Sequence, residues 1–142
     1  MKPRDTSISL EEAVKFHGHL GPYLVLGLRA GTLALQRTGS KKYFGIKVKV
    51  QGATHKPKSC LIDGLQLATG ATYGKGNIRK SNGPLLSIEI KNRLSQKGIL
   101  LRLTRSLLSE LSSARTHEES ELLAKKLFRE KASLLFIVTK LH

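Results

Sequence analysis

Apolar positions recur at helical spacing over two early segments of the chain, residues 10–16 and 22–38. Ser9 and Glu12 precede and open the first segment as a capping box, in which each side chain binds the other residue's backbone amide. The second segment opens on a proline, which suits a first helical turn, and stops before Gly39, a residue type that ends helices. The pattern therefore predicts two helices joined by a short corner.

Apolar and polar residues then alternate along residues 43–51, which predicts a strand with one buried and one solvated face. The same alternation over 86–91 and 99–103, with a turn between them, predicts a hairpin. An apolar run over 134–138 predicts a last strand. Helical spacing returns in between, over 60–69, 106–112 and 116–131. Because helices are mixed with hairpin-type strands rather than strict βαβ units, we expect an α+β fold. It would be a small mixed or antiparallel sheet packed by helices, in one domain over residues 1–142.

Two glycines, Gly27 and Gly31, lie four residues apart on the second predicted helix. Small residues at this spacing allow another backbone to come close, within the chain or across a dimer; the alternative is a pair of glycines that the helix merely tolerates. A sheet of few strands also leaves its edges exposed. We therefore expect a homodimer.

The formal net charge of +15 is concentrated in the middle of the chain, where the only acids between Ser40 and Arg105 are Asp63 and Glu89. Such a field attracts nucleic acid or other polyanions, although a solvated basic surface is the alternative. The aromatic residues are too few to predict a platform for stacking bases. We therefore expect weak, salt-sensitive nucleic-acid binding without sequence preference. The candidate contacts are Lys41, Lys42, Lys47 and Lys49.

A single cysteine excludes an internal disulfide and a four-cysteine zinc module. No apolar run reaches the length of a membrane span, and residues 1–5 lack the apolar segment of a signal peptide. We expect a cytoplasmic protein with no membrane partner.

The candidate chemistry lies at the corner between the first two helices, where His17 and His19 flank a glycine. Cys60 stands at the start of a later helix, where free amides and the helix dipole favour a thiolate, and Asp63 follows on the same face. Two imidazoles, a thiolate and a carboxylate are ligands that zinc and similar metals prefer. The alternative is that the histidines only pack in a bend and the cysteine is a small buried hydrophobe.

A glycine-rich loop, Gly74-Lys75-Gly76-Asn77, resembles a phosphate loop only weakly, because it lacks the Walker spacing and does not follow a predicted strand. The alternative is a tight connection whose glycines allow backbones to approach closely. We keep Lys75 and Asn77 as candidates for residues near the site.

Four stretches together resemble the successive motifs of the FmdE family, which is named after the E-type subunit of formylmethanofuran dehydrogenase. They are Phe16-His17-Gly18-His19-Leu20-Gly21-Pro22, Gly27-Leu28-Arg29-Ala30-Gly31, Cys60-Leu61-Ile62-Asp63-Gly64-Leu65-Gln66 and Thr69-Gly70-Ala71-Thr72-Tyr73-Gly74-Lys75-Gly76-Asn77. The resemblance covers residues 10–135, and it implies an α+β core that forms an intertwined dimer. Some members add a C-terminal zinc module, so this chain is similar to a member with the core domain only.

The resemblance further implies a metal pocket with His17, His19 and Cys60 as ligands of a divalent transition metal, zinc being expected. It places Asp63 and Gln66 nearby. The chain departs from the family pattern at Ala71, where many members have cysteine, and at Gln51, where many have an acid.

The implied function is a small metal-binding accessory or sensor protein linked to one-carbon or metal-cofactor metabolism. One alternative is an enzyme that uses the bound metal or the Cys60 thiolate directly. A further alternative is a basic module that binds polyanions. The catalytic residues and the small-molecule ligand stay unknown at this point.

Overall fold

The computed structural model describes residues 8–141; the N-terminal residues 1–5, in which no signal peptide is expected, lie outside this range. The helices are α1 (Leu10–His17), α2 (Pro22–Thr38), α3 (Cys60–Thr69), α4 (Arg105–Ser113), α5 (His117–Arg129) and α6 (Ala132–Leu135). The strands are β1 (Ile46–Gln51), β2 (Ile78–Ser81), β3 (Ser87–Asn92), β4 (Gly98–Leu103) and β5 (Phe136–Leu141), and a 3₁₀ turn, η1 (Tyr43–Gly45), precedes β1.

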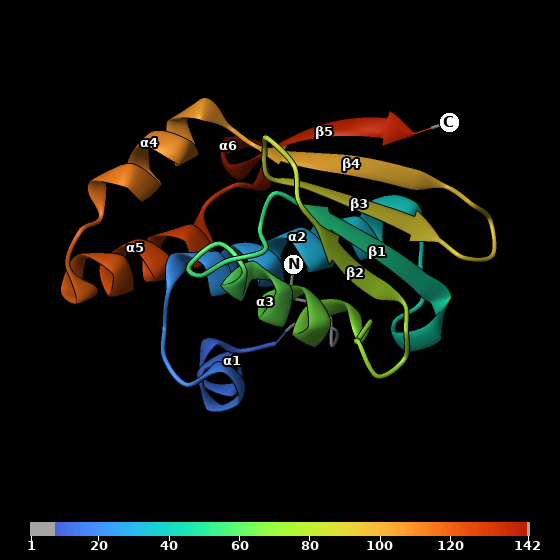
Figure 1. Ribbon diagram of the computed structural model, residues 1–142, viewed down its shortest axis with the longest axis horizontal. Helices are drawn as coiled ribbons and strands as arrows, with labels where there is room; N and C mark the ends of the chain where they lie inside the picture. The colour runs from blue at the N-terminus through green and yellow to red at the C-terminus, as the bar shows by residue number, and fades with distance from the viewer. Residues whose placement is uncertain (1–7, 142) are drawn as a thin grey trace.

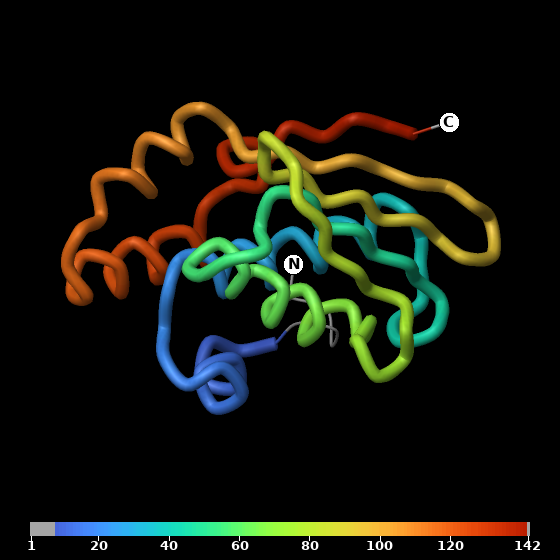
Figure 2. Tube along the Cα trace, viewed as in Figure 1, coloured from blue at the N-terminus to red at the C-terminus, as the bar shows by residue number. Residues whose placement is uncertain are grey.

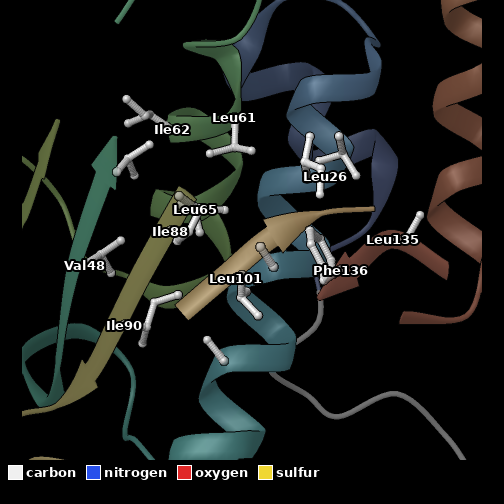
Figure 3. Close-up of a cluster of buried hydrophobic side chains, with 14 of the residues drawn as sticks. Leu26, Val48, Leu61, Ile62, Leu65, Ile88, Ile90, Leu101, Leu135 and Phe136 are labelled. Atoms are coloured by element: carbon white, nitrogen blue, oxygen red, sulfur yellow. The ribbon is translucent and has the colours of Figure 1, made fainter. Parts of the chain in front are cut away.

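The strands form one mixed sheet in the order β2-β1-β3-β4-β5, with β1 and β2 parallel and the other neighbours antiparallel. The helix α2 runs along this sheet, with α3 and α5 beside it (Figure 1). Alternate strand residues such as Val48, Ile88 and Leu101 meet Leu26 and Leu65 in a buried core between the sheet and the helices (Figure 3). The α+β expectation is confirmed.

The structure contains the helix caps from which the helix boundaries were predicted. Both capping boxes form: Ser9 with Glu12 opens α1, and Thr116 with Glu119 opens α5. At Gly39, after α2, the backbone adopts a left-handed conformation with φ 63°, which glycine accepts without strain.

The strand β2 was not predicted from the sequence, and its presence changes the topology. Residues 78–81 carry only one buried side chain, Ile78, so they show no alternation that would predict a strand. The chain therefore contains a parallel β1–α3–β2 unit beside its antiparallel strands. The last strand also begins later than expected, because residues 132–135 form the short helix α6.

The glycines of α2 serve a contact inside the chain. A Cβ atom at Gly27 would lie 2.0 Å from the carbonyl oxygen of Leu61, and one at Gly31 would lie 2.7 Å from the Cβ atom of Ala68. On the facing helix α3, a Cβ atom at Gly64 would lie 2.2 Å from the carbonyl oxygen of Leu24. The two helices α2 and α3 thus touch backbone to backbone where a side chain would separate them. These glycines therefore lend no support to a dimer, which stays a prediction.

Within residues 8–141, no helix combines the length and apolar character needed to cross a membrane.

Candidate functional site

The histidine corner forms as the sequence predicts. The helix α1 ends at His17, and Gly18 reverses the chain with φ 108°, a left-handed conformation open to glycine. The helix α2 then starts at Pro22. This corner lies at the same end of the molecule as the loop before α3 and the turn before α5 (Figure 2).

A short hydrogen bond joins the corner to α3. The Nδ1 atom of His17 lies 2.6 Å from Oδ2 of Asp63. Only 10% of the His17 side chain is exposed. Because a carboxylate accepts hydrogen bonds, His17 donates from Nδ1, so the lone pair of the neutral imidazole lies on Nε2. Asp63 thus fixes both the orientation and the tautomer of this imidazole.

A cavity of about 180 Å³ opens beside the two histidines. His19 and Cys60 line it together with His17, and the ring centres of the two histidines are 4.9 Å apart. The remaining lining comes from the start of α2, from Pro57, and from α4 and α5. The structure therefore gathers the three expected ligand residues around one cavity.

A second cavity, of about 320 Å³, shares His17 and Cys60 with the first. Asp63 and Gln66 of α3 line it, so both expected neighbours lie beside the histidine corner. Tyr73 and two lysines, Lys56 and Lys80, complete much of its rim. Burial raises the pKa of the Tyr73 hydroxyl.

The thiolate expected at Cys60 is not favoured. Burial, and next the Asp63 carboxylate, raise the pKa of the Cys60 thiol above its usual value. The amides at this helix start are also occupied, since those of Cys60 and Leu61 donate to the carbonyls of Pro57 and Lys58. Both influences oppose the thiolate that the helix start was expected to favour.

The donor atoms at this site suit a transition metal, but they are not arranged as a complete metal site. Within residues 8–141, no three His, Cys, Asp or Glu side chains stand in an arrangement ready to hold an ion. The donors around the first cavity are nonetheless two imidazoles and a thiol, a set that zinc prefers. His19 is exposed and Cys60 is partly so, which leaves both side chains room to turn.

Two other candidates lie elsewhere. Asn77 is buried and structural, since its amide donates to the carbonyl oxygens of Tyr43 and Ile46 at 2.6 and 3.0 Å. Lys75 extends over the Tyr43 ring, away from both cavities. The glycine-rich loop is therefore a connection into β2 that brings Lys75 to η1. Ala71, where relatives of the expected family have cysteine, is fully buried in the core.

His117 was not among the site residues predicted from the sequence. This residue opens α5, and its ring stacks near that of His19, with ring centres 6.2 Å apart. The capping box at Thr116 was visible in the sequence and places a histidine at the helix start. No sequence signal showed that this helix start returns to the corner before α2.

The candidate polyanion contacts lie near and along β1. Lys41 and Lys42 precede η1, and Lys47 and Lys49 are exposed on the face of β1 opposite the core. They are remote in sequence from the histidine corner and line neither of its cavities.

These features define a small α+β domain with a histidine-lined cavity at its helical end. The chain belongs to the FmdE family, described as "FmdE, Molybdenum formylmethanofuran dehydrogenase operon", whose model matches residues 16–137. The match includes the corner, the Cys60 helix and the start of α5.

Two relatives show how far the likeness extends. A probable S-adenosyl-L-methionine-binding protein of Archaeoglobus fulgidus is 31% identical over 91 residues, which is 63% of this chain. The match spans only 25% of that protein's length. The crystal structure of an FmdE-like protein of the tungsten formylmethanofuran dehydrogenase type, from Syntrophus aciditrophicus, superposes with a TM-score of 0.64 at 22% identity. The superposition covers 100% of this chain and 78% of that protein's chain, which establishes the shared fold.

Proposed function

We propose that this chain is an accessory protein of the FmdE type that binds a divalent transition metal, zinc or one similar, at the histidine corner. The ligands in this proposal are His17, His19 and Cys60. The physiological link is to one-carbon or metal-cofactor metabolism, in keeping with the family's association with formylmethanofuran dehydrogenase.

The observation that carries the proposal is the pair of His17 and Asp63. A histidine that binds metal through one nitrogen commonly donates a hydrogen bond from the other nitrogen to a carboxylate. The 2.6 Å contact at Nδ1 leaves Nε2 of His17 free, on a ring that lines the first cavity. Asp63 lies on another helix, α3, which also carries Cys60, so this contact holds the His17 ring in place relative to the helix of the third proposed ligand.

The other residues have distinct tasks in this proposal. His19 supplies a second nitrogen from the exposed side of the corner, and Cys60 supplies sulfur after loss of its proton to solvent. Asp63 orients His17 and adds negative charge that favours a bound cation. When bound, zinc supplies a Lewis acid and a cross-link between α1 and α3.

Elemental analysis of protein purified without a metal-affinity tag tests the proposal. We expect about one zinc or similar ion per wild-type chain and almost none in His17→Ala. The control is His55→Ala, because His55 lies in an exposed loop and lines neither of the two cavities at the corner. Equal metal content in His17→Ala and His55→Ala would overturn the proposal.

The Asp63→Asn variant tests whether Asp63 strengthens metal binding by orienting His17 or only by its negative charge. Loss of a carboxylate that orients a metal-bound histidine commonly weakens metal binding about 10–100-fold. We therefore expect this loss in a competition titration with a zinc chelator. Glu121→Gln removes the same charge from α5 beside His117 and should change the affinity much less.

A further inference from the structure

Two aromatic rings project into solvent at the start of β1. Tyr43 is 54% exposed and Phe44 is 68% exposed, both in the turn η1. Exposed aromatic side chains are costly to solvate and are enriched where a protein binds a partner. The histidine corner does not use either ring, since neither lines its cavities.

The turn is held firmly. Tyr43 has φ 72°, a left-handed conformation that costs a tyrosine energy and persists only when its surroundings impose it. The buried Asn77 donates to the Tyr43 carbonyl, and the Tyr43 ring packs so closely on Gly70 that a Cβ there would lie 2.4 Å from Cδ1. The backbone at Phe44 is therefore held in place before any ligand arrives.

Lysines surround these rings. The Lys42 ammonium lies 5.3 Å from the centre of the Tyr43 ring. The Lys75 ammonium lies 5.6 Å from the same centre and 5.7 Å from that of Phe44. Lys47 follows on the exposed face of β1, opposite Lys91 of β3 in register. Residues 41–88 hold a single acid, Asp63, and its carboxylate is hydrogen-bonded to His17; the next acid, Glu89, lies opposite Lys49 in register.

We propose that this aromatic–lysine surface binds single-stranded nucleic acid. It consists of Lys41, Lys42, Tyr43, Phe44, Lys47 and Lys75. Phe44 stacks on an unpaired base, while the lysines contact phosphates on either side. A single strand fits better than a duplex, because a duplex hides the base faces that Phe44 would meet.

The proposal revises the expectation drawn from composition. The chain has few aromatic residues, but two of them are consecutive, and the fold exposes both and brings Lys75 beside them. It also gives the glycine-rich loop a use, since that loop positions Lys75. The proposal is independent of the metal site.

Fluorescence anisotropy with a labelled oligothymidylate of about 20 nucleotides tests it, since such a strand spans the site sizes known for single-strand binding folds. We expect Phe44→Ala to weaken binding about tenfold, the equivalent of about 1.4 kcal/mol of stacking. The dependence of affinity on salt should stay unchanged in this variant, because no charge is lost. Phe16→Ala is the control, since Phe16 is similarly exposed at 56% but lies on α1.

The lysines should behave in the opposite way. Changing Lys42, Lys47 and Lys75 together to Gln should lower the slope of log affinity against log salt by about 2, since each phosphate contact contributes about 0.7. The matched control changes three exposed lysines elsewhere, Lys125, Lys131 and Lys140, and should leave most of the slope intact. Circular dichroism checks that each variant is folded.

Three results would overturn the proposal. One is equal affinity of Phe44→Ala and Phe16→Ala, and another is equal loss from the two triple variants. The third is binding to a duplex, or to vesicles containing anionic lipid, that is as tight as binding to the single strand. That third result would identify a general polyanion surface.

Discussion

Replacing Gly27 with alanine tests whether α2 and α3 need their backbone contact. The added Cβ would lie 2.0 Å from the Leu61 carbonyl oxygen, 2.8 Å from the Leu65 nitrogen and 2.9 Å from the Gly64 Cα. All three neighbours are backbone atoms, so no side chain can turn away. The two helices must separate instead, which loosens the core on both sides of the contact.

The magnitude follows from two opposing terms. Overpacking a tight interior costs about 1–3 kcal/mol, and occasionally more. Alanine gains about 1 kcal/mol over glycine through helix propensity. Because the overlap here is with backbone, the first term should lie at or above its upper end. We therefore expect Gly27→Ala to lose about 2 kcal/mol or more of unfolding free energy.

Urea unfolding followed by far-ultraviolet circular dichroism measures this loss. Two further alanine variants make a graded series. At Gly31 the added atom would meet the Ala68 side chain at 2.7 Å, which predicts a smaller loss. At Gly74 the nearest atom is 3.7 Å away, which predicts little change or a slight gain. If Gly27→Ala and Gly74→Ala have the same free energy of unfolding, the reasoning is refuted.

Three other outcomes are expected. Backbone hydrogen bonds from Arg115 and Thr116 hold the pKa of Glu119 below its usual 4.5. The ionised carboxylate therefore contributes fully to the free energy of unfolding above pH 4.5, and this contribution is lost as the pH falls through the lowered pKa. Glu119→Gln should therefore flatten the fall in unfolding free energy between about pH 6 and about pH 3, measured by urea titration at each pH. Arg29→Met should cost about 2 kcal/mol in the same assay, because the guanidinium donates to the carbonyls of Leu127 and Phe128 at 2.7 and 3.2 Å. Sedimentation at micromolar concentration should show a homodimer, and a monomer would contradict that expectation.

Local signals in the sequence were sufficient for most of the fold. Capping residues and helix-ending glycines are recognised from a few neighbouring residues, so the bounds of α1, α2 and α3 could be predicted closely. The strand β2 could not, because its pairing with β1 depends on where α3 returns the chain. Only Ile78 faces the core there, and one apolar residue sets no period.

The candidate site, like the fold, was predicted only in part from the sequence. The chemistry of His17, His19 and Cys60 is visible in the sequence, as is their relation to known motifs. The roles of neighbouring residues depend on the tertiary structure. Asp63 bonds to a helix 46 positions earlier, and Asn77, which looked like a loop residue near the site, is buried beneath η1.

The helix α1 has a weak attachment to the rest of the molecule. Of residues 10–17, only Ala13 is fully buried, and the bond from His17 to Asp63 supplies the directional link to α3. A helix held by so little apolar area opens more readily than the core does. Amide hydrogens of α1 should therefore exchange with solvent sooner than those of α2. Any ligand that binds His17 would slow this exchange, and the exchange would become slower as the fraction of molecules with an occupied pocket rises.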